Sequence, residues 1–194
     1  MGWLSAGASM TDRGAERSAP KVWTIGHGTL ESAGLVSLLH GAGIDELVDI
    51  RAFPGSRRNP QFGRDEMARW LPDEGIAYTW MSDLGGRRKP TPDSRHTSLR
   101  HPSFRAYADY METPQFLAAV EDLISEADRV VMCSESVWWR CHRRLLADHL
   151  VIVEDVPVVH LMHDGREVPH PITEGARRDD EGVIYDAVAP DPSS

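Results

Sequence analysis

Short runs of apolar residues alternate along the chain with longer segments in which apolar residues recur every three or four positions. The short runs predict five β-strands, at residues 21–27, 46–51, 76–81, 129–133 and 156–162. The longer segments predict five helices, at residues 30–40, 64–71, 103–111, 114–127 and 141–150. Ser103 is a plausible N-cap for the third of these helices, because its hydroxyl can accept a hydrogen bond from a free backbone N–H group.

The order of these elements predicts an α/β architecture. A strand, a helix and a second strand within about 30 residues form a βαβ unit, which packs onto a parallel sheet. We therefore expect a single three-layer α/β domain over residues 21–170, with a mostly parallel, doubly wound sheet and helices on both faces. Residues 1–20 are rich in Gly, Ala and Ser and are expected to be a disordered leader, and residues 171–194 a peripheral C-terminal extension.

Two segments lack regular periodicity. Residues 52–63 form a loop rich in Pro, Gly, Arg and Asn, and residues 84–102 form a longer basic segment that Gly85, Gly86 and Pro90 interrupt. Loops as long as the second one are usually functional lids or disordered segments.

Composition and charge narrow the class of protein. A chain of 194 residues with 41% hydrophobic residues can build one domain with a core, and no apolar run approaches the ~20 residues of a membrane span. Only two cysteines occur, which favours a reducing cytoplasm over a secreted disulfide scaffold. The net charge of −9 argues against a protein that coats nucleic acid, although the basic residues between Arg51 and Arg105 are compatible with a local anion site.

Polar and reactive residues lie at the carboxyl ends of the predicted strands. These residues are His27, Asp49, Arg51, Cys133 and Glu135. Ligands bind open parallel sheets at the carboxyl ends of the strands, so we expect a site along this edge.

The segment from Cys133 to Arg144 carries the strongest chemical signal. Cys133 ends a strand, and Arg140, Cys141, His142 and Arg143 lie at the start of the next helix, whose N-terminus can bind an anion and stabilise a thiolate. Rhodanese-like sulfurtransferases and cysteine phosphatases use the same order of strand, cysteine, loop, arginine and helix. Here the bulky residues 137–139 replace the small residues that such loops prefer.

Each candidate has a structural alternative. Cys133 is either a nucleophile or a packed core thiol. A structural zinc site needs a second close pair of ligands, which Cys133, Cys141 and His142 lack, so no metal site is expected. His27 is either a general base or a hydrogen-bonded strand end. Asp49 is more readily explained as the partner of Arg51 or Arg143 than as a general acid. Arg51 and Arg57 suit recognition of phosphate or carboxylate, although Arg57 also suits a solvated loop.

Several motifs in the same order resemble the bacterial and archaeal family called domain of unknown function 488. The motifs are Thr24-Ile-Gly-His27, Leu47-Val-Asp-Ile-Arg51 with Pro54 and Ser56, Leu84-Gly-Gly86, Phe104 to Met111, and Cys133-x-Glu135 followed by Cys141-His-Arg143. The resemblance spans about Val22 to His170 and implies a three-layer α/β fold without an established activity. The family's common features would map to His27, Asp49, Arg51, Glu135, Cys141, His142 and Arg143. Gly28 stands where relatives often have Ser, and residues 137–139 occupy a loop that is commonly more polar.

Three functional hypotheses follow. The first is a hydrolase or group-transfer enzyme that acts on a small phosphorylated or nucleotide-like anion. In this enzyme the anion would be held by Arg51, Arg140 and Arg143. Protons would be moved by His27 or Glu135, and the nucleophile would be Cys133 or Cys141. The second is a nucleic-acid or nucleotide binding module without catalysis, which would use the basic stretch from Arg51 to Arg105. The third is a redox- or metal-responsive protein that would use Cys133, Cys141 and His142. No cofactor is identified by these residues.

Overall fold

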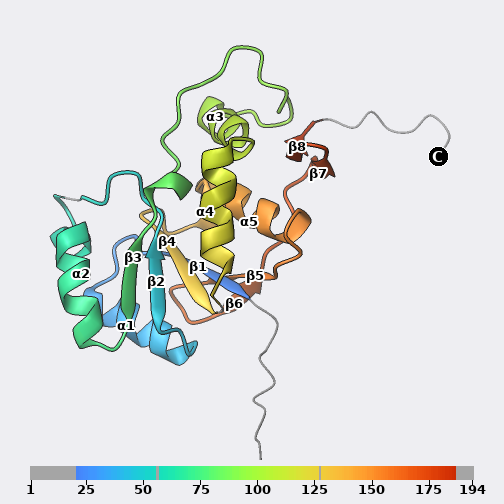
Figure 1. Ribbon diagram of the computed structural model, residues 1–194. Helices are drawn as coiled ribbons and strands as arrows, with labels where there is room; N and C mark the ends of the chain where they lie inside the picture. The colour runs from blue at the N-terminus through green and yellow to red at the C-terminus, as the bar shows by residue number, and fades with distance from the viewer. Residues whose placement is uncertain (1–20, 56, 127, 187–194) are drawn as a thin grey trace, which may run out of the picture.

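The five predicted strands and a sixth that was not predicted, β6, form one sheet, as seen in a computed structural model that describes residues 21–55, 57–126 and 128–186 (Figure 1). The strands are β1 (Val22–Gly26), β2 (Glu46–Asp49), β3 (Ala77–Trp80), β4 (Arg129–Cys133), β5 (Val158–Leu161) and β6 (Glu167–Pro169). Their order across the sheet is β3-β2-β4-β1-β5-β6, and only β6 pairs antiparallel to its neighbour. The prediction of a mostly parallel sheet is confirmed. β4 lies between β1 and β2, so the first two strands of the chain are not neighbours.

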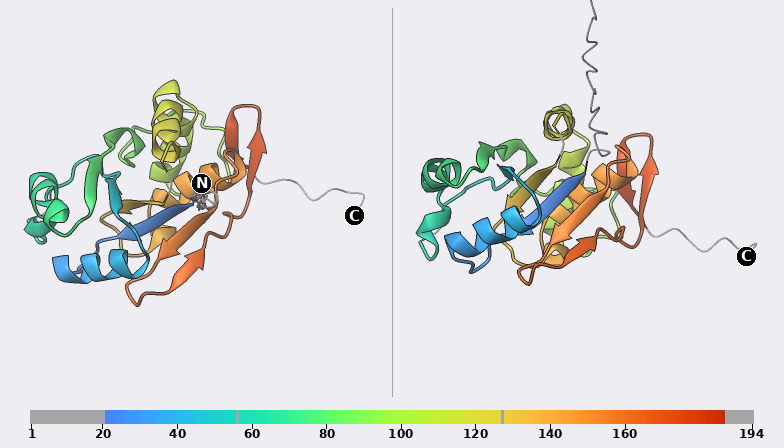
Figure 2. Two further views of the ribbon diagram at one scale, coloured as in Figure 1. Left: turned by 60° about the horizontal axis from the view of Figure 1, so that its bottom comes forward. Right: turned by 90° about the horizontal axis from the view of Figure 1, so that it is seen from below.

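Helices cover both faces of the sheet. They are α1 (Ser32–Gly41), α2 (Arg64–Asp73), α3 (Pro102–Met111), α4 (Pro114–Ile124) and α5 (Arg143–Ile152), with short 3-10 turns η1 (Pro60–Phe62), η2 (Ser82–Leu84) and η3 (Trp138–Arg140). In both views of Figure 2 the sheet lies between α1 on one side and α4 on the other. The three-layer α/β fold is confirmed.

The alternation of side chains along each strand supplies the two apolar layers. In β4, Val130 and Met132 face the cluster that contains α1 and α2, whereas Val131 and Cys133 face the cluster that contains α3, α4 and α5. Because successive side chains in a strand point to opposite faces, a strand covered on both sides needs apolar residues at every position. This explains the uninterrupted run Val130-Val-Met-Cys133.

The helix termini differ slightly from the sequence predictions. The N-cap of α3 is His101, whose Nδ1 accepts a hydrogen bond from the Ser103 N–H group at 3.2 Å, so Ser103 lies inside the first turn. α4 ends at Ile124 rather than near residue 127, which itself lies outside the described residues. α5 begins at Arg143, because the preceding residues form η3 instead of a helical turn.

The segment beyond residue 170 is more closely packed than expected. It forms a hairpin of β7 (Ala176–Asp179) and β8 (Gly182–Tyr185), and Val183 and Tyr185 are buried in the core. The Tyr185 hydroxyl donates to Asp148 Oδ2 at 2.9 Å, and the Thr173 N–H group donates to Asp148 Oδ1 at 2.8 Å. Asp148 on α5 therefore ties this segment to the domain. The proposed leader, residues 1–20, and residues 187–194 lie outside the described part of the chain.

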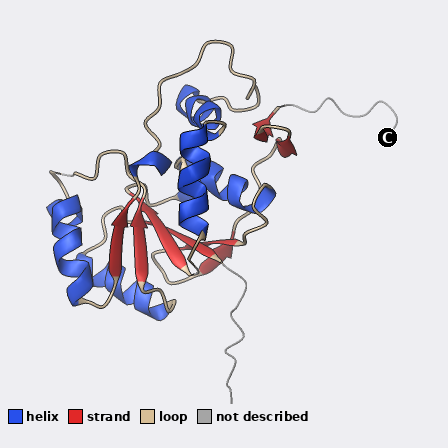
Figure 3. Ribbon diagram, viewed as in Figure 1, coloured by secondary structure: helices blue, strands red, loops and turns tan. Residues whose placement is uncertain are grey.

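Parallel pairing brings the carboxyl ends of three strands together. Gly26 pairs with Cys133, and Asp49 pairs with Met132, so β1, β2 and β4 end at the same level. Figure 3 shows the strands converging toward this end of the sheet. Among the described residues, no helix is long and apolar enough to cross a membrane.

Candidate active site

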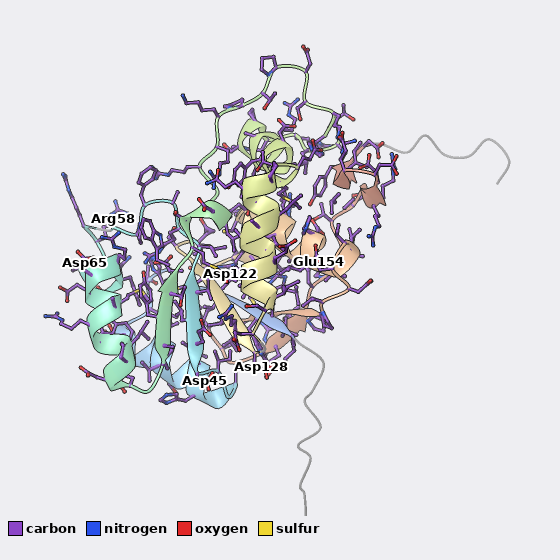
Figure 4. All side chains as sticks on the ribbon, viewed as in Figure 1. Asp45, Arg58, Asp65, Asp122, Asp128 and Glu154 are labelled. Carbon is purple, nitrogen blue, oxygen red and sulfur yellow. The ribbon has the colours of Figure 1, made fainter. Side chains whose placement is uncertain are left out.

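A cavity of about 470 Å³ lies at the carboxyl ends of β1, β2 and β4. Its walls come from the loops after β1, β2 and η2, from the start of α3 and from the loop that joins β4 to α5. Figure 4 labels Arg58, a cavity residue, at this end of the molecule, whereas Asp45 and Asp128 lie at the opposite end of the sheet.

Two thiols lie in contact at this cavity. The Sγ atoms of Cys133 and Cys141 are 2.7 Å apart, and both residues line the cavity although they are only 2% and 6% exposed. Cys133 is the last residue of β4, and Cys141 follows η3 directly, so the loop between them folds back on itself. Both cysteines are free.

Arg143 is the cation beside this pair. Its Nη1 donates to Cys133 Sγ at 3.1 Å, and its Nη2 donates to the carbonyl oxygen of Ser136 at 3.0 Å. The side chain is 2% exposed and forms no ion pair with a carboxylate of any described residue. A buried guanidinium requires an anionic partner, and the thiolate form of Cys133 can be that partner.

The titration of the two thiols differs in direction. Burial by itself raises the pKa of Cys133, but the hydrogen bond with Cys141 and the charge of Arg143 outweigh burial and lower this pKa to about 7. Burial and the hydrogen bond with Cys133 raise the pKa of Cys141 well above its ordinary value. The arrangement favours a Cys133 thiolate that accepts a hydrogen bond from the Cys141 thiol.

Asp49 and Arg51 form a buried ion pair beside the thiols. Asp49 Oδ1 accepts hydrogen bonds from the Arg51 N–H group at 3.0 Å and from Arg51 Nε at 2.8 Å. Asp49 Oδ2 accepts from Arg51 Nη2 at 2.5 Å and from the Tyr78 hydroxyl at 2.8 Å. Asp49 is fully buried, and its partner is Arg51 rather than Arg143. This geometry favours the structural interpretation of the carboxylate.

His27 lines the cavity with both ring nitrogens engaged. Its Nδ1 donates to the Gly28 carbonyl oxygen at 3.0 Å, and its Nε2 accepts from Arg51 Nη1 at 3.3 Å. The ring stacks on Phe62 with centroids 4.5 Å apart. Burial, and then the charge of Arg51, lower the pKa of His27 to about 4, so the ring is neutral at pH 7. These contacts favour a positioning role over that of a general base.

His142 closes the other side of the thiol pair. Its Nδ1 lies 3.5 Å from Cys141 Sγ, and its ring packs edge-on against Tyr107. Burial, followed by the charges of Arg143 and Arg88, lowers the pKa of His142 to about 3. A neutral imidazole therefore lies beside Cys141. Within the described residues, no group of three or more His, Cys, Asp or Glu side chains is arranged to hold a metal ion.

Glycines allow the loops to approach the thiols. A Cβ atom on Gly26 would overlap the Glu135 carbonyl oxygen and lie 2.5 Å from Arg143 Nη1. Gly28 has a φ of +51°, in the left-handed region, and a Cβ there would overlap the Ser136 hydroxyl. Ser136 thus occupies the space that a side chain at position 28 would need.

Four backbone N–H groups around the start of α5 are bonded to nearby carbonyl oxygens. The N–H groups of Arg140 and Cys141 donate to the carbonyl oxygens of Val137 and Trp138, and those of Arg144 and Leu145 donate to Cys141 and His142. The expected anion cradle at the N-terminus of α5 is therefore reduced, and Arg143 stabilises the thiolate instead. Trp138 stacks on His160, with centroids 4.2 Å apart, and Trp139 is 45% exposed.

Three further cations line the cavity. They are Arg58, Arg87 and Arg140, and none forms an ion pair with a carboxylate of the described residues. Arg87 lies over the ring of Phe53, which is 72% exposed. Glu135 is the acidic side chain of the cavity wall, and it is exposed. The charged side chains of the cavity wall that lack an ion-pair partner among the described residues are therefore mostly positive.

The structure brings together most of the residues that the sequence singled out. Seven of them line the cavity: His27, Arg51, Cys133, Glu135, Arg140, Cys141 and His142. Two more, Asp49 and Arg143, lie directly behind it. Arg57 is exposed and does not line the cavity, whereas its neighbour Arg58 does. Sequence reasoning did not single out Arg87, although the basic segment after Gly85-Gly86 was a signal for it. Phe104, at the start of the motif Phe104 to Met111, also lines the cavity.

Comparison with known proteins identifies the family of the chain. Residues 32–150 match the family model described as Domain of unknown function DUF488. That range contains the Asp49–Arg51 pair, both cysteines and Arg143. No curated protein and no solved structure matches the chain.

Proposed function

The chain belongs to the family Domain of unknown function DUF488, and because that description names no activity, we propose a function from the geometry of the cavity. The protein is an enzyme that attacks a small anionic substrate with the Cys133 thiolate. The reaction class is group transfer, and hydrolysis is the variant in which water accepts the transferred group.

The contact between Arg143 and Cys133 carries this proposal. Arg143 Nη1 lies 3.1 Å from Cys133 Sγ, and the guanidinium has no carboxylate partner among the described residues. A positive charge next to a thiol stabilises the thiolate, which is the nucleophilic form. A thiol that served only as core packing would need no such partner.

The charge of the cavity supports an anionic substrate. Arg58, Arg87 and Arg140 extend from three different loops to the same space, without carboxylate partners among the described residues. Guanidinium groups bind phosphate, sulfate and carboxylate groups through paired hydrogen bonds. In the proposed reaction these arginines hold the anion while the thiolate attacks its electrophilic atom. The bond to the leaving group breaks, and the leaving group departs with the electron pair.

The basic stretch from Arg51 to Arg105 gives weaker support to a nucleic-acid binding module. Arg51 is buried on Asp49, Arg88 donates to three backbone carbonyls and stacks on Tyr110, and Arg95 pairs with Glu112 and Asp179. Cations that are committed to internal partners do not release counterions from a phosphate backbone. We therefore favour a small anion as the ligand.

Alkylation of Cys133 tests the proposal. Iodoacetate is an anion and iodoacetamide is its neutral analogue, and ordinary thiolates react faster with the neutral reagent. We expect the reduced protein to reverse this preference at low salt, and inorganic phosphate to slow the reaction with iodoacetate. Arg140→Gln should remove the preference for iodoacetate, whereas Arg69→Gln, on the outer surface of α2 and 73% exposed at its side chain, should not.

Two results would contradict the proposal. One is a Cys133 that reacts no faster at pH 7 than a thiol in the unfolded chain. The other is a ratio of iodoacetate to iodoacetamide rates that Arg140→Gln leaves unchanged, because the arginines would then not act on an anion in the cavity.

A further inference from the structure

The second thiol is not needed for simple nucleophilic attack, yet it contacts the first one inside the cavity. We propose that Cys141 resolves a covalent intermediate on Cys133, and that the substrate is an anion carrying a transferable sulfane sulfur atom. This inference rests on the proposed function and deepens it by naming the chemistry of the substrate and the fate of the intermediate.

The position of Cys141 supports a resolving role. Its Sγ lies 2.7 Å from Cys133 Sγ, and both thiols face the cavity from a single short loop. A disulfide needs a sulfur separation of about 2.05 Å, so little movement joins the two side chains. Any group attached to Cys133 is therefore within reach of the second thiol.

The surroundings assign different roles to the two sulfur atoms. Cys133 accepts a hydrogen bond from Arg143 Nη1, which stabilises its anion and makes it the attacking thiolate. Burial, and then the hydrogen bond with Cys133 and the negative charge of its thiolate, raise the pKa of Cys141 and keep it protonated. When Cys141 in turn attacks, its proton passes to the departing outer sulfur, which leaves as hydrosulfide, while the neutral His142 ring lies 3.5 Å from Cys141 Sγ.

The second thiol favours sulfur transfer over phosphoryl transfer. Water releases phosphate from a phosphocysteine without help from a second thiol. Transfer of sulfur, in contrast, uses both thiols.

The proposed reaction has two steps. In the first, the Cys133 thiolate attacks the outer sulfur of an anion of the thiosulfate type; the sulfur–sulfur bond of the anion breaks, sulfite leaves with the electron pair, and a persulfide anion forms on Cys133. In the second, the Cys141 thiol loses its proton and attacks Cys133 Sγ, which forms the Cys133–Cys141 disulfide and releases the outer sulfur as hydrosulfide. The two thiols are oxidised by two electrons, and the transferred sulfur is reduced by two. A small thiol reductant restores the pair for the next turnover.

The arginines explain why sulfur fits better than a peroxide. In sulfur transfer the leaving group is an anion, which Arg58, Arg87 and Arg140 can hold as it departs. The leaving group of a peroxide is water or an alcohol, for which three guanidinium groups offer no advantage. The persulfide formed on Cys133 is an anion as well, and Arg143 can stabilise it as it stabilises the thiolate.

A single-turnover experiment tests the inference. The full-length reduced protein, freed of reductant, is mixed with thiosulfate, and sulfite, sulfide and free thiols are measured together with the intact mass. We expect one sulfite and one sulfide per chain, the loss of both free thiols, and a peptide map that joins Cys133 to Cys141. Cys133→Ser should reduce both products to background.

The variant Cys141→Ser separates the two steps. It should still release sulfite and gain the mass of one sulfur atom on Cys133, but it should release no sulfide. Cys141→Ala serves as a second variant if the serine hydroxyl disturbs the buried contact, and circular dichroism shows that each variant is folded. Sulfide release from either variant at the wild-type level would show that Cys141 does not resolve the intermediate.

Two outcomes separate this inference from the proposed function. If thiosulfate yields no sulfite while Cys133 keeps its preference for iodoacetate and its protection by phosphate, the sulfur chemistry is wrong and the anion-binding enzyme remains. If hydrogen peroxide forms the Cys133–Cys141 disulfide but thiosulfate does not, the assignment of the substrate as a sulfur donor is likewise overturned. If the iodoacetate preference is absent as well, both proposals fail.

Discussion

Arg143 is the residue on which the candidate site depends most. Its guanidinium is buried, it contacts Cys133 Sγ and the Ser136 carbonyl oxygen, and it has no carboxylate partner among the described residues. Burial of an unpaired cation is costly, so the thiolate and the guanidinium stabilise each other. The Arg143 side chain therefore links the ionisation of Cys133 to the conformation of the cysteine loop.

Replacing Arg143 should change the titration of Cys133. In the wild type, the rate of alkylation by iodoacetamide should rise with pH through a midpoint near 7, because the pKa of Cys133 is about 7. Loss of the positive charge in Arg143→Gln should move the midpoint upward by about 1–3 units and slow alkylation at pH 7 roughly tenfold or more. Stopped-flow alkylation across pH measures the midpoint.

Arg144→Gln is the matched control for this prediction. Arg144 is the next residue of α5 and stacks on Phe104 rather than on the thiols. Its substitution should leave the midpoint where it is. An unchanged midpoint in Arg143→Gln would mean that the guanidinium does not hold Cys133 as a thiolate.

The Asp49–Arg51 pair should contribute to stability rather than to proton transfer. Asp49 accepts four hydrogen bonds from Arg51 and Tyr78 while fully buried, so Asp49→Asn leaves a buried guanidinium without its charge partner. We expect a loss of about 3–5 kcal/mol in the free energy of unfolding, measured by urea denaturation. Asp65→Asn, in the exposed pair with Arg64, should cost no more than about 1 kcal/mol. Equal effects of the two substitutions would contradict the structural role of Asp49.

At the scale of elements, the site is the meeting of strand ends with one closely packed loop. β1 ends at Gly26 beside Cys133, and the loop from β4 to α5 passes so close to Gly26 that its carbonyl at Glu135 leaves no room for a side chain. The loop is therefore held by backbone contact with β1 as well as by Arg143. Element packing, not the length of the loop, sets the distance between the two thiols.

The substitution Gly26→Ala should displace this loop. The added methyl group would overlap the Glu135 carbonyl oxygen and press on Arg143 Nη1, and overpacking of this kind typically costs about 1–3 kcal/mol. We expect lower thermal stability and loss of the fast alkylation of Cys133. Gly41→Ala is the control: it lies at the end of α1 with open space around it, so it should be neutral or stabilise by about 0.5–1 kcal/mol. A Gly26→Ala protein with wild-type thiol reactivity would show that the loop is not held in this way.

At the scale of the whole molecule, several buried histidines are neutral. Burial is the largest cause in each case, and it lowers the pKa of His27 and His149 to about 4 and of His142 and His160 to about 3. These residues come from the end of β1, from α5, from β5 and from the cysteine loop, so they are distributed through the core. Protonation of any of them opposes the folded state.

The domain should therefore lose stability in mild acid. Below about pH 6.5 the unfolded chain binds protons at these histidines and the folded chain does not, so the free energy of unfolding decreases as the pH falls. Each pKa unit corresponds to about 1.4 kcal/mol, so each histidine should cost about 2 kcal/mol by pH 5. The sum approaches the total stability of a typical domain, about 5–15 kcal/mol, so we expect acid unfolding near pH 5.

Urea denaturation at pH 7 and at pH 5.5 measures this effect, and circular dichroism against pH locates the acid transition. His160→Gln should reduce the slope of stability against pH, because it removes one of the buried neutral histidines. Stability that stays constant between pH 7 and pH 5.5 would contradict the prediction.

The sequence by itself determined the layered fold and the edge that carries the site. Apolar runs such as Val130 to Cys133 predict buried strands from local pattern alone, and the rule that ligands bind at strand carboxyl ends then points to His27, Arg51 and Cys133. The pairing of Asp49 with Arg51 was also accessible, because the two residues are neighbours on one strand end and a buried carboxylate needs a cation.

Only the tertiary structure decided how these residues meet. Loop paths and side-chain rotamers leave no periodic pattern in the sequence, so the sequence does not predict the contacts that depend on them. These are the contact of Cys133 with Cys141 and the pairing of the thiolate with Arg143 rather than Arg140. The positions of Arg58 and Arg87 in the cavity wall depend on loop paths in the same way. The burial of Tyr185 is of the same kind, since β7 and β8 are short and partly charged and are held by Asp148 on α5. Local pattern reports whether a residue is buried, whereas the identity of its neighbour is set by the packing of segments far apart in the chain.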